Sequence, residues 1–236
     1  MAIGPETRVY PRTVDQAAID QGLRAYMLRV YNYMASGLAL TGIVAYLAAE
    51  SGVYASIAAT PLIWLVIFAP LGFVFFLSAR IHKMSVSTAQ TTFWLFAAVM
   101  GLSMASIFLQ FTGDSIARVF FITGGTFAAM SLYGYTTKRD LSKWGSFLFM
   151  GLIGVIIASV VNLFVGSSAL QFAISIIGVL VFVGLTAYDT QQIKEMYSVN
   201  DDGSVSGRKA VMGALRLYLD FINLFMMLLQ LFGDRR

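Results

Sequence analysis

Residues 144–188 read WGSFLFMGLIGVIIASVVNLFVGSSALQFAISIIGVLVFVGLTAY, and no charged side chain interrupts them. A single helix of about 45 residues would be roughly 67 Å long, more than twice the hydrocarbon thickness of about 30 Å. The segment therefore predicts two membrane-spanning helices that fold back on each other. Turn residues within 162–168 (Gly166, Ser167 and Ser168) mark the break. We expect one span at about 146–165 and the next at about 169–189.

The rest of the chain contains further apolar stretches of spanning length, which is about 20 residues. We expect these spans at 30–49, 61–79, about 92–111, 119–135 and 211–232. The sequence thus predicts an all-α integral membrane protein with a transmembrane domain of seven helices at 30–236. Residues 1–29 are polar and are predicted to form a cytoplasmic N-terminal segment.

Composition supports a membrane protein and argues against several other classes. Hydrophobic residues make up 58% of the chain and charged residues 12%, against about 25% charged in soluble domains. There is no cysteine and a single histidine, His82, which excludes thiol chemistry and a histidine metal cluster. We find no nucleophile–base pair, phosphate loop or basic nucleic-acid surface. We therefore expect that the protein is not an enzyme, uses no cofactor and binds no nucleic acid.

The basic residues predict the orientation of the chain. Seven alternating spans place twelve Lys and Arg residues with the N-terminus and only three on the other side. Because cytoplasmic loops are enriched in Lys and Arg, we expect a cytoplasmic N-terminus and an external C-terminus. The compact loops favour a bacterial inner membrane, and an endomembrane of a eukaryote is the alternative. Arg216 and Asp220 lie inside the last span, so a re-entrant seventh segment is the alternative.

Two aspartates are the candidate functional residues. A charge at the bilayer centre costs about 2.5–3.5 kcal/mol on insertion scales, and Asp220 lies well inside the seventh span. Asp189 follows the long uncharged run at the end of the sixth span. Since these two spans are antiparallel neighbours, the carboxyl groups reach similar depths and are expected to meet. The alternatives are a local ion pair of Asp220 with Arg216 and a solvated helix end at Asp189.

The pairing of two carboxyl groups suggests a specific chemistry. Two carboxylates in a low-dielectric site resist ionising together, so they take up and release protons as one unit. When deprotonated, Asp189 and Asp220 offer the hard oxygen ligands that calcium prefers, and carboxylates along a pore select cations. Arg80 ends the second span on the same side and is a candidate counter-charge, although an arginine there commonly extends to the interface instead.

Small residues four positions apart predict close helix packing. The pairs are Gly124 with Ala128, Gly125 with Ala129, and Gly154 with Ala158.

Several motifs resemble the Bax inhibitor-1 family, also called the transmembrane Bax-inhibitor-motif family. The most specific are GLTAYDTQQIKEM (184–196) and ALRLYLDFINLFMMLLQLFG (214–233). Further similar stretches are FVFFLSARIHKMS (73–85), GLSMASIFLQFTG (101–113) and FFITGGTFAAMSLYGYTTKRDLSKWG (120–145).

The resemblance implies a fold and an activity. The fold is a central C-terminal helix wrapped by six others in two three-helix layers, and the activity is a pH-sensitive calcium leak. The two-aspartate sensor of the family corresponds to Asp189 and Asp220, and its second-span arginine to Arg80.

We therefore expect a calcium leak or channel-like protein gated by protonation of the aspartate pair. Calcium is the expected transported or bound ion, and protons and the lipid bilayer are the other partners. Two alternatives stay open. One is an interaction protein that modulates a membrane-anchored quality-control protease or a stress response, and the other is a proton-coupled transporter.

Overall fold

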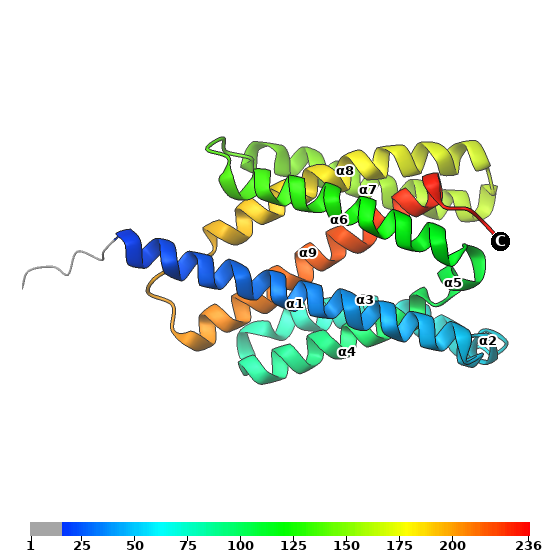
Figure 1. Ribbon diagram of the computed structural model, residues 1–236, viewed down its shortest axis with the longest axis horizontal. Coiled ribbons are helices and arrows are strands. Elements are labelled where there is room, and N and C mark those ends of the chain that lie inside the picture. Colours follow the sequence, from blue (N-terminus) through cyan, green and yellow to red (C-terminus); the bar gives the residue numbers. More distant parts are fainter. Residues whose placement is uncertain (1–15) are drawn as a thin grey trace, which may run out of the picture.

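The computed structural model describes residues 16–236, and these contain seven helices long and apolar enough to cross a membrane (Figure 1). The protein is thus an all-α membrane protein, and the predicted number of spans is confirmed. A short α5 (Ser106–Gln110) extends the third span, and a short α2 (Val53–Ala58) joins the first two. The long helices are α1 (Gln16–Glu50), α3 (Leu62–Arg80), α4 (Val86–Met104), α6 (Gly113–Thr136), α7 (Ser142–Val165), α8 (Ser168–Glu195) and α9 (Gly203–Phe232).

The first helix begins earlier than the apolar pattern predicts. α1 starts at Gln16 rather than near residue 30, so the described part of the polar N-terminal segment is helical. Tyr26 and Met27 in this extension are buried. The ring of Tyr26 lies 5.6 Å from that of Tyr197, which follows α8. The extension therefore packs against the connection between α8 and α9, and its charged residues do not prevent it from continuing the helix.

The C-terminal helix lies at the centre of the bundle. Of the 18-residue stretch that makes α9 apolar enough to span a membrane, 67% is buried. The corresponding share is 11% in α3 and in α7. Figure 1 shows α9 crossing between one group formed by α1, α3 and α4 and another formed by α6, α7 and α8. This arrangement is the central-helix fold that the sequence resemblance implied.

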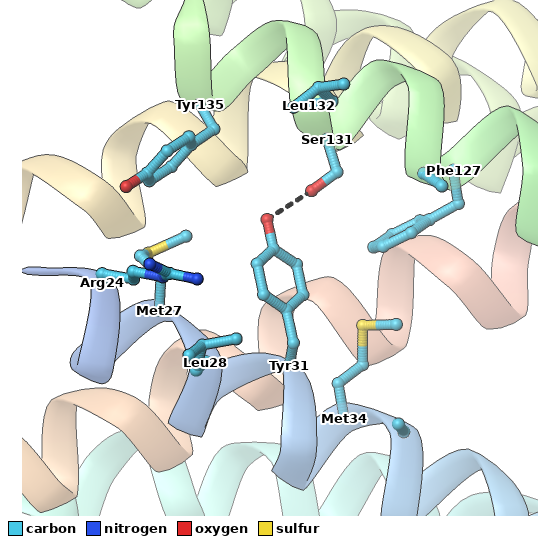
Figure 2. A pocket seen from close by; sticks show the side chains of 11 residues that line it. Arg24, Met27, Leu28, Tyr31, Met34, Phe127, Ser131, Leu132 and Tyr135 are labelled. Carbon is cyan, nitrogen blue, oxygen red and sulfur yellow. Dashed lines mark hydrogen bonds between the residues drawn. The ribbon is translucent and has the colours of Figure 1, made fainter.

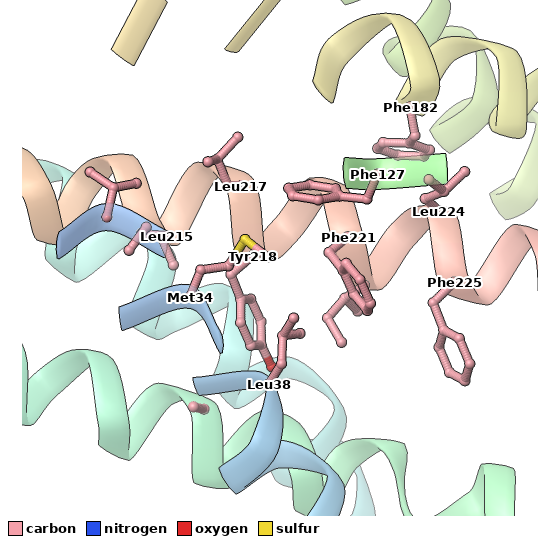
Figure 3. Close-up of a cluster of buried hydrophobic side chains, with 14 of the residues drawn as sticks. Met34, Leu38, Phe127, Phe182, Leu215, Leu217, Tyr218, Phe221, Leu224 and Phe225 are labelled. Atoms are coloured by element: carbon pink, nitrogen blue, oxygen red, sulfur yellow. The ribbon is translucent and has the colours of Figure 1, made fainter. Parts of the chain in front are cut away.

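A buried polar chain ties α9 to two helices of the first group. Tyr218 packs edge-on against Phe93 and Phe96, with ring centroids 6.0 and 5.2 Å away. Its hydroxyl lies 2.6 Å from the Thr41 hydroxyl, which donates to the carbonyl oxygen of Ala97 at 2.8 Å. Since the single Thr41 hydroxyl proton is used in that bond, Tyr218 donates to Thr41. Figure 3 shows Tyr218 among the apolar side chains around α9.

Two glycines permit close approach of helix backbones, and neither belongs to the predicted pairs. A Cβ atom at Gly134 would lie 2.2 Å from the carbonyl oxygen of Ala187 on α8, and one at Gly101 would lie 2.5 Å from that of Thr41 on α1. At Gly124, Gly125 and Gly154 a Cβ atom would meet nothing within 4 Å. The predicted packing role of these three glycines is therefore wrong, because their sides of α6 and α7 do not face another helix closely.

Candidate functional site

Asp220 is a buried carboxyl group in the middle of α9. Its relative exposure is 5%, and its Oδ2 atom has no hydrogen-bond partner among the described residues. Buried polar atoms in proteins nearly always have a partner, so an unpaired carboxyl oxygen requires an explanation. The unpaired oxygen marks Asp220 as a candidate functional residue.

The structure brings Asp189 and Asp220 together in one cavity. Asp189 lies near the end of α8, and both carboxyl groups line a space of about 710 Å³ between α3, α7, α8 and α9. They are close enough for each to act electrostatically on the other. The rest of the wall is mainly apolar and includes Leu71, Val74, Phe149, Leu152, Ile156, Phe182 and Leu185. Apolar walls make the surroundings of the pair a poor solvent for two negative charges.

Arg216 is the cation that the structure places at this site. It lies one helical turn before Asp220, lines the same cavity, and its charge acts on both aspartates. It does not form an ion pair with them, because within residues 16–236 the ion pairs are Arg118 with Asp234 and Lys209 with Asp201. The local Arg216–Asp220 ion pair considered as an alternative is therefore not formed in this conformation.

The structure does not bring Arg80 to the aspartates. Arg80 is the last residue of α3, its side chain is exposed, and it does not line the cavity. Leu71 and Val74 are the α3 residues that reach the cavity instead. Sequence reasoning placed Arg216 in the seventh span but did not recognise it as the cation beside both carboxyl groups. Its spacing of one turn from Asp220 suggested only a local ion pair with that residue.

A second cavity of about 490 Å³ adjoins the first. The two share Val74, Arg216 and Leu219, and the second extends to His82 and to the first turns of α9. Basic side chains line this end, but two are held by the protein: Arg208 donates to the Met84 carbonyl oxygen, and Lys209 pairs with Asp201 at 2.6 Å. The aspartates thus lie next to a space that leads to the end of the bundle where α9 begins.

The opposite direction along α9 is apolar. Beyond Asn223 its buried side chains are Leu224, Phe225, Leu228 and Leu229. The buried side chains of this stretch therefore offer no ligand to an ion.

A cation at the aspartate pair would have few protein ligands. Within the part of the chain that the structure describes, no group of three or more His, Asp or Glu side chains is arranged to hold a metal ion. Calcium takes six to eight oxygen ligands, so Asp189 and Asp220 would bind it together with water.

The loop before α9 contains another carboxylate, Asp202, which is exposed, unlike Asp220. Asp202 caps α9, and hydrogen bonds from the Val205 backbone N–H and from Ser204 hold its pKa below the usual range. A carboxyl group with a lower pKa in the folded state stabilises the fold at pH values above its unfolded-state pKa of about 3.9. This stabilisation is lost as the pH falls through the folded-state pKa. This cap therefore stays charged near neutral pH and does not contribute to a pH response there.

Comparison with known proteins identifies related chains. A family model described as "Inhibitor of apoptosis-promoting Bax1" matches residues 23–236. An inner membrane protein of Escherichia coli K12, YbhL, is 48% identical over 96% of this chain and 99% of its own length. An uncharacterized protein of Rickettsia prowazekii is also 48% identical, over 98% of each chain. An uncharacterized membrane protein of Streptococcus pyogenes is 36% identical over 91% of this chain and 94% of its own.

Proposed function

Because the chain belongs to the Bax inhibitor-1 family, we propose that it is a calcium leak whose conductance depends on pH through Asp189 and Asp220. The observation that carries this proposal is the placement of both carboxyl groups in one cavity between transmembrane helices, with an Asp220 oxygen left unpaired among the described residues. The seven-helix fold and the family are consistent with it.

The pair acts as both ligand and sensor. When deprotonated, it attracts a calcium ion into the cavity and favours the conducting state. When protonated, it loses its charge, and the apolar stretch of α9 beyond Asn223 stays closed. Arg216, rather than Arg80, is the counter-charge that competes with calcium for the carboxylates, because it lines both adjoining cavities.

Calcium flux from purified protein in liposomes tests the proposal. We expect flux that depends on pH between about pH 5 and pH 8, because the pair titrates as one unit. Protein-free liposomes are the control for leakage. A correctly folded protein that gives no calcium flux at any of these pH values would exclude the leak and favour an interaction role.

The same assay separates the two arginines. We expect Arg216→Gln to move the midpoint of the pH dependence to higher pH, because removing a nearby cation disfavours the charged carboxylates. Arg80→Gln is the matched control and is expected to keep the wild-type midpoint, since Arg80 does not line the cavity. The reverse result, a shift in Arg80→Gln alone, would return the counter-charge role to Arg80.

We also propose a location and an orientation. The relative YbhL is an inner membrane protein, which supports a bacterial inner membrane for this chain. The twelve-to-three distribution of basic residues supports a cytoplasmic N-terminus and an external C-terminus. Reporter fusions after Arg236 are expected to be active only as periplasmic reporters, whereas an active cytoplasmic reporter would overturn this orientation.

A further inference from the structure

A second site lies between α1 and α6, away from the aspartates. It is a pocket of about 540 Å³ that is open on its outer side to the surroundings of the bundle. Figure 2 shows Arg24 and Tyr135 at one end and Met34 and Phe127 at the other. Its lining residues come from both helices and include Arg24, Met27, Tyr31, Met34, Phe127 and Ala128.

The position of this pocket restricts what can fill it. Both helices are membrane-spanning, and the lining residues Leu28 and Leu132 are 52% and 63% exposed, so the pocket faces the lipid phase. From Arg24 to Ala35 the α1 side extends about 16 Å at 1.5 Å per residue. One leaflet contributes about half of a 30 Å hydrocarbon core. The pocket therefore has the length and the apolar lining of a site for a lipid acyl chain.

The end of the pocket near the start of α1 is cationic. Among the described residues, the ion pairs do not include Arg24, whose exposed side chain lines the pocket. Lys194 of α8 lies beside Tyr135, donates to its carbonyl oxygen at 2.9 Å, and has its ammonium group 5.2 Å from the ring centre. Charge complementarity at this end favours an anionic phosphate group, which arginine binds in a planar, bidentate way.

We propose that the α1–α6 pocket holds one anionic phospholipid from the leaflet in which α1 begins. Its phosphate group lies at Arg24, and one of its two acyl chains runs along Met27 and Met34 of α1 and Phe127 of α6. The lipid fills the space that the small residue Ala128 leaves open.

The bound lipid also contacts a polar connection to the functional site. Tyr31 lines the pocket, and its hydroxyl lies 2.6 Å from that of Ser131, which lies 3.0 Å from the Thr190 hydroxyl on α8. Thr190 directly follows Asp189. A lipid that orders Tyr31 therefore orders the segment of α8 that carries one of the two aspartates.

Native mass spectrometry of the purified protein in detergent tests this site. We expect one phosphatidylglycerol molecule to be retained in preference to phosphatidylcholine. Arg24→Gln should lower that preference about fivefold, which corresponds to about 1 kcal/mol, the usual contribution of one basic residue to anionic lipid binding. Arg29→Gln, an exposed arginine on the same helix that does not line the pocket, is the matched control and should keep the preference.

A second variant tests the acyl-chain part of the site. Ala128→Trp fills the pocket and should abolish retention of both lipids, and its elution as a monodisperse species shows that it folds. Equal retention of the two lipids by the wild-type protein, or unchanged retention in Arg24→Gln and Ala128→Trp, would overturn the proposal. If the wild-type protein gives the mass of a dimer and Ala128→Trp does not, the occupant of the pocket is instead a second copy of the chain. None of these measurements depends on calcium flux.

Discussion

Replacing either Asp189 or Asp220 by asparagine is expected to abolish most of the pH dependence of calcium flux, and replacing both is expected to add little. The reason is that two carboxyl groups in one low-dielectric cavity exchange protons as a unit. Asparagine retains the size and hydrogen-bonding ability of aspartate but removes the charge and the exchangeable proton. Mutations in a shared site are non-additive, and this is the property that the double variant measures.

The measurement is calcium flux in liposomes for the wild-type protein, the two single variants and the double variant. Asp140→Asn is the matched control, because this residue lies in the loop between α6 and α7. Hydrogen bonds from Ser142 hold the pKa of Asp140 below its usual value, so it keeps its charge near neutral pH. Asp140→Asn should therefore follow the wild-type profile. Independent and additive effects of the Asp189 and Asp220 replacements would disprove the shared site.

Loss of the pH dependence of flux in these variants is not expected to reflect unfolding. A charged group in the membrane is costly, and Asp220 has an oxygen without a partner among the described residues. Asp220→Asn removes that charge, so its thermal stability should equal or exceed that of the wild-type protein. A stable protein with an altered pH response assigns the effect to titration of the site.

The membrane fold and the aspartate pair were accessible from the sequence for physical reasons. Each spanning helix must satisfy its backbone within lipid, so apolar length alone indicates the number of spans. Asp220 was conspicuous because a charge at membrane depth is rare. Its meeting with Asp189 followed from the antiparallel order of α8 and α9, and both line one cavity.

The rotation of each helix about its axis was not accessible from the sequence. Arg80 and Arg216 both lie towards the side of the membrane that is predicted to be cytoplasmic. The rotation of α3 leaves Arg80 exposed, whereas Arg216 lines the cavity. The early start of α1 was also missed, because its first turns are polar yet pack through Tyr26 and Met27. Such contacts depend on neighbouring helices, which composition does not specify.

The rotation of α6 also decides which of its glycines contacts another helix, and this leads to the prediction with the largest effect on stability. Gly124 and Gly134 lie on α6, but only Gly134 meets another backbone, since a Cβ atom added there would lie 2.2 Å from the Ala187 oxygen. Gly134→Ala must separate α6 from α8. We expect it to destabilise the protein by about 3 kcal/mol, at the upper end of overpacking effects, and to lower the Tm by roughly 6–12 °C.

Gly124→Ala is the control for this variant, since a methyl group there meets nothing within 4 Å. It should raise the Tm by roughly 2–4 °C, because alanine is favoured over glycine within helices by about 1 kcal/mol. Thermal unfolding followed by tryptophan fluorescence measures both variants. Ala187 lies two residues before Asp189, so separating α6 from α8 should also move this carboxyl group and reduce calcium flux in Gly134→Ala. Equal Tm values for the two variants would show that α6 and α8 are not in backbone contact at Gly134.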